Sequence, residues 1–161
     1  MPKVAVCFVC LGNICRSPTA EGVMRHLARG QGIEADLLID SAGTSAYHVG
    51  EAPDRRATQA ARRRSIVLSG ASRQFVKKDF ARFDWVLAMD RENQSDLIGL
   101  APDAAAEAKI HLFRSFDPHA NGDLDTPDPY YGGDRGFETV IDICERACLG
   151  LIERLRAQGA L

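Results

Sequence analysis

The chain has 161 residues, a length that fits one domain built around one core. Its 20 basic and 22 acidic side chains nearly cancel, so no overall charge favours nucleic acid or an anionic membrane surface, and we expect binding to neither. The five cysteines are an odd number and the hydrophobic content is ample for an ordinary core, which argues against a disulfide scaffold and indicates the reducing cytoplasm.

The start of the chain predicts a central strand followed by a helix. Residues 4–9 are apolar at every position, which is typical of a strand buried on both faces of a parallel sheet. Ser17 and Pro18 favour a helix start, and apolar residues then recur at helical spacing. We therefore expect a helix from Pro18 to Gly30.

The rest of the chain continues the alternation of strands and helices. The further expected elements are a strand over 37–39 ending in a turn over 40–44, a helix over 56–64, a strand over 84–89, a helix over 91–100, a short strand over 109–113 and a long amphipathic helix over 137–156. The alanine-rich segment 101–108 is expected to be exposed and without special structure. The stretch 115–136 is expected to be irregular, and loops of that length in compact domains are usually functional. The pattern predicts an α/β fold: one three-layer domain over residues 1–161, with a parallel sheet flanked by helices on both faces.

The segment between the first strand and the first helix is typical of an anion-binding loop. It lies at the carboxyl end of a central strand, where open α/β sheets bind ligands. Backbone N–H groups can curl around an anion there, and the following helix adds its positive end. Gly12 and Asn13 tolerate the left-handed backbone that such curling needs. The residues expected to bind phosphate are Leu11, Gly12, Asn13, Ile14, Cys15, Arg16 and Ser17.

Cys10 is the candidate nucleophile of this loop. A thiol beside a helix N-terminus is stabilised as its thiolate. Arg16 offers a planar fork of donors that matches two phosphoryl oxygens, and Ser17 can donate a hydrogen bond to the sulfur. A cysteine six residues before an arginine is also compatible with a buried strand-end cysteine and a solvated arginine. The preceding strand, the Gly-Asn centre and the helix start favour catalysis.

The long irregular stretch supplies a candidate proton donor. A phenol leaving group has a pKa of about 10, so its departure at neutral pH benefits from a positioned acid. The stretch contains Asp123, Asp125 and Asp128, and only Asp128 lies between two prolines, which restrict the backbone. We expect Asp128 to be the acid.

Three tyrosines are candidates for the walls of a pocket that accepts a phenyl ring. Tyr130 and Tyr131 follow the acid directly, and Tyr47 lies on another loop. Aromatic walls would favour phosphotyrosine over phosphoserine. The alternative is a solvated turn with structural tyrosines.

Three separate motifs resemble those of the low-molecular-weight protein tyrosine phosphatases. They are VCLGNICRSP over 9–18, DSAGT over 40–44 and PDPYYGG over 127–133, and the likeness spans nearly the whole chain. The resemblance implies a four-stranded parallel sheet, a phosphocysteine intermediate, no metal or other cofactor, and the roles given above to Cys10, Arg16 and Asp128. It also implies tyrosine-phosphorylated proteins as substrates. For the oligomeric state we expect a monomer or weak dimer.

The resemblance assigns further roles around the loop. Asn13 and Ser41 correspond to residues that support the phosphate loop in this family. Cys15 corresponds to a second loop cysteine that can form a reversible disulfide with Cys10, although simple packing explains it equally well. The chain departs from the family at Gly70, where many members carry a histidine of the supporting network, so the loop has to be supported differently.

Two other functions fit parts of the sequence. An arsenate reductase shares this fold, but it needs additional redox cysteines near the third strand, and none occurs between Cys15 and Cys144. A non-catalytic phosphate-binding module would lack the thiol or the acid, and both are present. Cys144 and Cys148 lie on one face of the last helix and are interpreted as core packing. The histidines show no metal-ligand spacing and are interpreted as surface or cap residues: His26, His48, His111 and His119.

Overall fold

The computed structural model describes the backbone of residues 1–161 and every side chain except that of residue 134. Within this backbone, four parallel strands form one sheet in the order β2-β1-β3-β4, which confirms the predicted α/β fold. The strands are β1 (Val4–Cys10), β2 (Leu37–Gly43), β3 (Trp85–Ala88) and β4 (Ile110–Leu112). The helices are α1 (Arg16–Gly30), α2 (Arg55–Arg62), α3 (Asp79–Arg82), α4 (Arg91–Leu100), α5 (Ala104–Glu107) and α6 (Asp134–Ala157), with single 3-10 turns η1 (Glu34–Asp36) and η2 (Phe113–Phe116).

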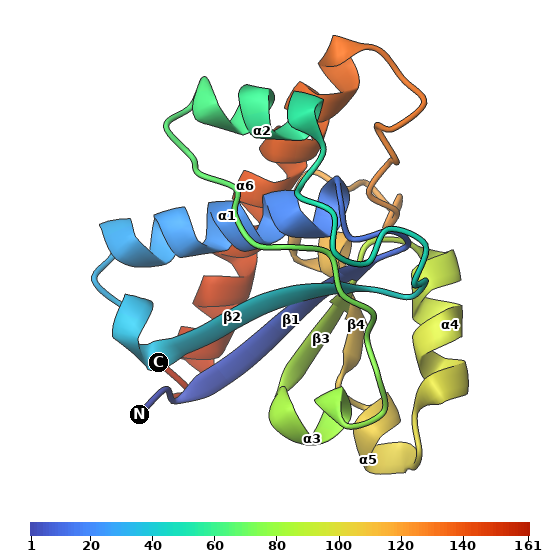
Figure 1. Ribbon diagram of the computed structural model, residues 1–161. Helices are drawn as coiled ribbons and strands as arrows, with labels where there is room; N and C mark the ends of the chain where they lie inside the picture. Colours follow the sequence, from blue (N-terminus) through green and yellow to red (C-terminus); the bar gives the residue numbers. More distant parts are fainter.

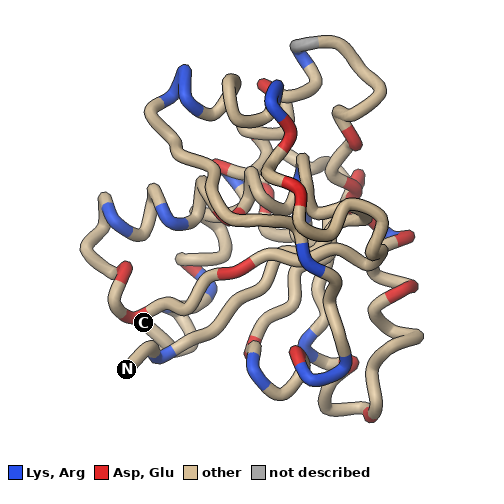
Figure 2. The backbone as a smooth tube through the Cα atoms, viewed as in Figure 1, with Lys and Arg blue, Asp and Glu red and all other residues tan. Residues whose placement is uncertain are grey.

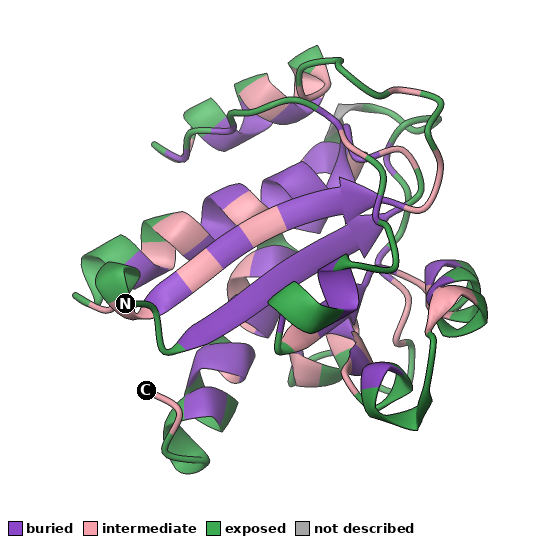
Figure 3. Cartoon of the chain, turned by 60° about the horizontal axis from the view of Figure 1, so that its bottom comes forward, coloured by how far each residue is buried: buried purple, intermediate pink, exposed green. Residues whose placement is uncertain are grey.

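Helices cover both faces of the sheet, as the apolar run in β1 predicts. On one face α1 and α6 share an apolar cluster with Val6 and Phe8, and α2 packs on the outer side of these two helices; on the other face α3, α4 and α5 share a cluster with Cys7 and Val9 (Figure 1). Every residue of β1 is buried, as the purple central strand in Figure 3 shows. Charged residues lie mainly outside the strands (Figure 2), so the site at the end of β1 is built on an apolar platform.

Two local predictions were wrong. Residues 40–43 form the end of β2 instead of a turn, because the strand stays paired with β1 as far as Gly43 opposite Cys10. The segment 101–108 contains the short helix α5, in which Asp103 caps the N-terminus through a 2.8 Å bond from the N–H of Ala106. Ala106 is buried against the second face of the sheet, so packing gives this segment a structure that its composition does not indicate.

The predicted helix 91–100 coincides with α4, and the other boundaries differ from the predictions by no more than three residues. One of these differences bears on the site. Helix α1 begins at Arg16, so Arg16 and Ser17 lie in its first turn. The short helix α3 was not predicted. The strand order reverses between β1 and β3, which opens a crevice at their carboxyl ends. Cys10 ends β1 at this crevice, and Asp90 follows β3 there.

Candidate active site

The loop from Cys10 to Ser17 curls around the sulfur of its own first residue. The backbone N–H of Asn13 donates to Sγ of Cys10 at 3.2 Å, and Asn13 has a positive φ of 55°. The end of β2 lies directly against this curl: a Cβ at Gly43 would come within 2.7 Å of the carbonyl oxygen of Leu11. The glycine at position 43 therefore permits the close approach that shapes the loop.

The sulfur of Cys10 has one hydroxyl partner. It lies 2.9 Å from Oγ of Ser17, and both residues are buried. Oγ of Ser17 accepts a 2.8 Å bond from Nδ2 of Asn13, and its own proton has two acceptors within reach: the sulfur at 2.9 Å and the carbonyl oxygen of Ala42 at a longer 3.4 Å. A negative sulfur in this position receives a hydroxyl and an amide hydrogen bond.

Asn13 is the centre of the network that supports the loop. Its Nδ2 donates to Oγ of Ser17 and, at 3.0 Å, to Oγ of Ser41. Its Oδ1 accepts a 3.0 Å bond from the backbone N–H of Arg73. The structure thus brings together both residues expected to support the loop.

Two further supporting residues were missed in the sequence. Oγ of Ser41 donates to Glu21 at 2.6 Å, and Oγ of Ser72 donates to the carbonyl oxygen of Gly12 at 2.9 Å. Gly70 has a φ of +88° and lines a small polar hollow of about 150 Å3 behind the loop. In the absence of a histidine at position 70, Ser72 and Glu21 hold this side of the loop.

Arg16 is buried in the first turn of α1, with 4% of its side chain exposed. Its Nη1 donates to Oδ2 of Asp90 at 2.6 Å and to the carbonyl oxygen of Thr126 at 3.0 Å. Burial disfavours the charge, but Cys10 and Asp90 outweigh it, so the pKa of Arg16 is raised and the guanidinium stays positive. Sequence analysis did not identify Asp90, because no sequence pattern connects an acidic helix-capping residue with an arginine 74 positions away.

Asp128 approaches the same guanidinium from the other side of the crevice. Its Oδ2 lies 3.7 Å from Nη2 of Arg16, and its Oδ1 accepts a 3.0 Å bond from the N–H of Tyr130. The other two candidates point elsewhere: Asp125 accepts from the N–H of Arg91, and Asp123 pairs with the side chain of Arg114. Asp128 is the one of the three that lines the pocket.

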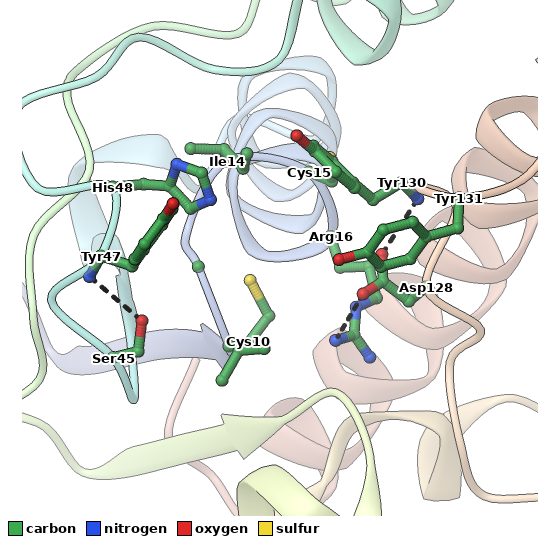
Figure 4. A pocket seen from close by; sticks show the side chains of 12 residues that line it. Cys10, Ile14, Cys15, Arg16, Ser45, Tyr47, His48, Asp128, Tyr130 and Tyr131 are labelled. Carbon is green, nitrogen blue, oxygen red and sulfur yellow. Dashed lines mark hydrogen bonds and ion pairs between the residues drawn. The ribbon is translucent and has the colours of Figure 1, made fainter.

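The pocket above Cys10 has a volume of about 340 Å3 and is bordered by aromatic rings. Figure 4 shows the Cys10 sulfur between Tyr47 and His48 on one side and Tyr130 and Tyr131 on the other. Tyr47 and Tyr131 are 86% and 90% exposed, so they form the rim, whereas Tyr130 is 37% exposed and lies deeper.

His48 was interpreted as a surface or cap residue, and its position in the pocket corrects this interpretation. The imidazole of His48 packs directly on Gly12, because a Cβ at Gly12 would come within 2.9 Å of Cδ2 of His48. Its Nδ1 lies 2.8 Å from Glu51. His111 is also partly buried, stacked on Trp85 at 4.7 Å, because β4 places it beside the sheet. His26 and His119 are exposed.

All five cysteines are free and buried. Cys15 lines the pocket, and burial together with nearby Asp54 raises its pKa well above the ordinary value, so it is a neutral thiol at pH 7. Cys144 and Cys148 are fully buried in the α6 core, in agreement with the packing interpretation. Among the described side chains, no group of three or more His, Cys, Asp or Glu could hold a metal ion.

Comparisons with known proteins agree on one family. A family model described as low molecular weight phosphotyrosine protein phosphatase matches residues 5–161. The human low molecular weight phosphotyrosine protein phosphatase is 45% identical over 151 residues, which cover 93% of this chain and 94% of the human protein. The low molecular weight protein-tyrosine-phosphatase of Streptomyces coelicolor is 46% identical over 95% of this chain and 94% of its own. The crystal structure of a protein tyrosine phosphatase from Entamoeba histolytica, with Hepes in the active site, superposes with a TM-score of 0.92 at 40% identity and covers 98% of this chain and 99% of that one.

Proposed function

The chain belongs to the low molecular weight phosphotyrosine protein phosphatase family, and we propose that it works through a phosphocysteine formed at Cys10. It is a protein-tyrosine-phosphatase, a hydrolase of phosphate monoesters. The observation that supports the assignment of residues is the position of one sulfur: Sγ of Cys10 lies at the floor of a tyrosine-bordered pocket, hydrogen-bonded to Ser17 and to the N–H of Asn13.

In the first step the thiolate of Cys10 attacks phosphorus. A bond forms between sulfur and phosphorus while the bond from phosphorus to the phenolic oxygen breaks, and Asp128 gives its proton to the departing oxygen. The guanidinium of Arg16 and the backbone N–H groups of the loop bind the non-bridging oxygens, where negative charge is spread. Tyrosine leaves as a neutral phenol.

In the second step water attacks the phosphocysteine. Asp128, now a carboxylate, takes a proton from the water while the water oxygen forms a bond to phosphorus. At the same time the bond between sulfur and phosphorus breaks. The hydroxyl of Ser17 stabilises the thiolate that is released. Inorganic phosphate leaves, and both Cys10 and Asp128 return to their starting protonation states.

The pocket fits this substrate class better than the alternatives. Tyr47, Tyr130 and Tyr131 border a space that can hold a phenyl ring, with the acid beside it. An arsenate reductase would need additional redox cysteines near the third strand, but no cysteine occurs between Cys15 and Cys144, and Cys144 and Cys148 are enclosed in the core around α6. A non-catalytic module would not require a proton donor in the pocket.

We infer a protective redox role for Cys15, which lines the same pocket as Cys10. Peroxide converts the Cys10 thiolate into a sulfenic acid, and Cys15 then attacks that sulfur, releasing water and forming a disulfide. Peroxide inactivation should be reversible by dithiothreitol in the wild type and irreversible in Cys15→Ala. Mass spectrometry that finds sulfinic and sulfonic acid at Cys10 in the wild type under mild peroxide would contradict this role.

The remaining inferences concern the setting of the enzyme. Tyrosine-phosphorylated proteins are the substrates, and we propose residues 1–161 as one phosphatase domain that acts as a monomer or weak dimer in the cytoplasm. Throughout the described residues, the helices are too short or too polar to span a bilayer. Acidic and basic residues are mixed over the molecule (Figure 2), which supports a protein substrate bound locally at the pocket rather than nucleic acid.

The test of the mechanism is the replacement Cys10→Ser. The variant should fold normally and release no phosphate from a phosphotyrosyl peptide, whereas the wild type, quenched with acid during turnover, should carry phosphate on Cys10. Cys144→Ala is the matched control, because it removes a buried sulfur that does not line the pocket. Turnover by Cys10→Ser, or phosphate found on another side chain, would refute the proposal.

A further inference from the structure

Arg56 makes an unusual set of contacts with the segment that carries the acid. It lies in the first turn of α2, far from Asp128 in the sequence. Its Nη2 donates to the carbonyl oxygen of Tyr130 at 3.1 Å. Its guanidinium lies 5.4 Å from the centre of the Tyr130 ring and 4.9 Å from the centre of the Phe137 ring, within the range of cation–π attraction. Arg56 therefore holds both the backbone and the ring of Tyr130.

The same guanidinium is tied to the phosphate loop through Asp54. Nε and Nη2 of Arg56 donate to the two carboxylate oxygens of Asp54 at 3.3 and 3.2 Å. The backbone N–H of Asp54 donates to the carbonyl oxygen of Ile14, in the middle of the loop, at 2.7 Å. Arg56 and Asp54 thus connect the two loops that meet at the substrate.

The acid segment, residues 127–131, follows the buried Thr126, whose N–H donates to the carbonyl oxygen of Met89 at 2.7 Å and whose carbonyl oxygen accepts from Arg16 at 3.0 Å. Beyond that residue the described structure gives the segment few contacts other than those with Arg56. Pro129 packs against Gly136 in the first turn of α6, where a Cβ would come within 3.3 Å of Pro129. The side chain of Asp128 is 39% exposed, and its contact with Arg16 is long at 3.7 Å. Asp128 instead takes its orientation from the N–H of Tyr130, the residue that Arg56 grips.

We propose that Arg56 is a positioning residue, which fixes the carboxyl of Asp128 at the right distance from the leaving oxygen by clamping Tyr130 to the phosphate loop. This inference rests on the assignment of Asp128 as the proton donor. Misplacement of a catalytic group by about 1 Å can cost as much as about 100-fold in rate. Loss of the clamp should therefore impair only those steps that need the proton.

The experiment compares aryl phosphates whose leaving phenols differ in pKa. For Arg56→Ala we expect kcat/KM to fall about 10-fold with phenyl phosphate, whose leaving group needs the proton, and less than about 3-fold with p-nitrophenyl phosphate, whose leaving group does not. Inhibition by inorganic phosphate should stay the same, because the phosphate loop is intact. The double variant Arg56→Ala with Asp128→Asn should have the same kcat/KM for phenyl phosphate as Asp128→Asn alone, because the acid that Arg56 positions is already absent.

Arg55→Ala is the matched control. Arg55 is the neighbouring exposed arginine, and the described part of the chain gives its side chain no hydrogen bond or ion pair, so all substrates should be turned over at the wild-type rate. Should Arg56→Ala unfold, Arg56→Lys keeps the charge without the planar fork and should show the same dependence on leaving group in weaker form.

An equal loss with both substrates, or no loss with either, would overturn the positioning role of Arg56. Failure of the proposed function would look different, because Asp128→Asn itself would then turn over phenyl phosphate at the wild-type rate.

Discussion

The loop over residues 10–17 and the acid segment over residues 127–131 border one pocket but are built in opposite ways. In the loop, Cys10 and Arg16 are 3% and 4% exposed, and their neighbours are hydrogen-bonded to one another. In the acid segment the side chain of Asp128 is 39% exposed and Tyr131 is 90% exposed. The loop is buried and held by its own hydrogen bonds, so removing these supporting bonds should alter stability and activity together. The acid segment lies on the surface, so changes there should alter activity alone.

The largest effect should come from Asp128→Asn. Because general acid catalysis contributes about 10²- to 10⁴-fold, kcat/KM for phenyl phosphate should fall by that amount. The free energy of unfolding should change by less than about 0.5 kcal/mol, since the side chain is a surface one. Asp123→Asn in the same stretch is the control and should be fully active. A destabilised Asp128→Asn protein would break the contrast between the two regions.

Asn13→Ala tests the opposite region. It removes three side-chain hydrogen bonds of about 1 kcal/mol each, so urea denaturation should show a loss of about 3 kcal/mol, and activity should fall for all aryl phosphates alike. Asn121→Ala is the control, because Asn121 has a similar positive φ of 51° but is exposed. If both variants lost the same stability, backbone conformation and not the network would be responsible.

Asp54 joins the two regions and makes stability depend on pH. Burial alone would raise its pKa, but the side chain and the N–H of Arg56 outweigh burial and lower it. A lowered pKa in the folded state means that the stabilisation is complete above the unfolded pKa of about 3.9 and is lost as the pH falls through the folded value. Asp54→Asn should thus be about 1 kcal/mol less stable at pH 7, with the difference vanishing in acid.

Thermal unfolding between pH 2 and pH 7 measures this difference. Asp103→Asn is the control. Asp103 also caps a helix, α5, but within the described structure it makes no ion pair with an arginine. A constant gap between wild type and Asp54→Asn at every pH would contradict the role of the Asp54 charge.

The smallest effect should come from Tyr131→Ala at the rim. Loss of an aromatic contact worth roughly 0.5–1 kcal/mol should raise KM for a phosphotyrosyl peptide about 3-fold, without a change in the melting temperature. Val67→Ala, which is 75% exposed but lies outside the pocket, should have no effect on KM. An unchanged KM in Tyr131→Ala would show that the rim does not contact substrate.

Predictions from the sequence were most accurate where the functional residues lie close together in the chain. The strand, curl and helix start around Cys10 lie within 15 residues, so local patterns predicted their order and the place of the sulfur at a strand end. They failed over 40–43, where Asp, Ser and Gly indicate a turn but pairing with β1 decides in favour of a strand. They also missed α5, because an alanine run gives no sign of which face will be buried.

By itself the sequence determined the fold class, the family and the order of the chemical groups along the chain, because these follow from hydrophobic periodicity and from short motifs. Only the tertiary structure decided which side chains support them. Asp90 meets Arg16 across 74 residues, Ser72 meets Gly12 across 60, and Arg56 meets Tyr130 across 74. An isolated acid, serine or arginine carries no local signal of its partner, since the partner is chosen by how the helices and loops pack around the sheet.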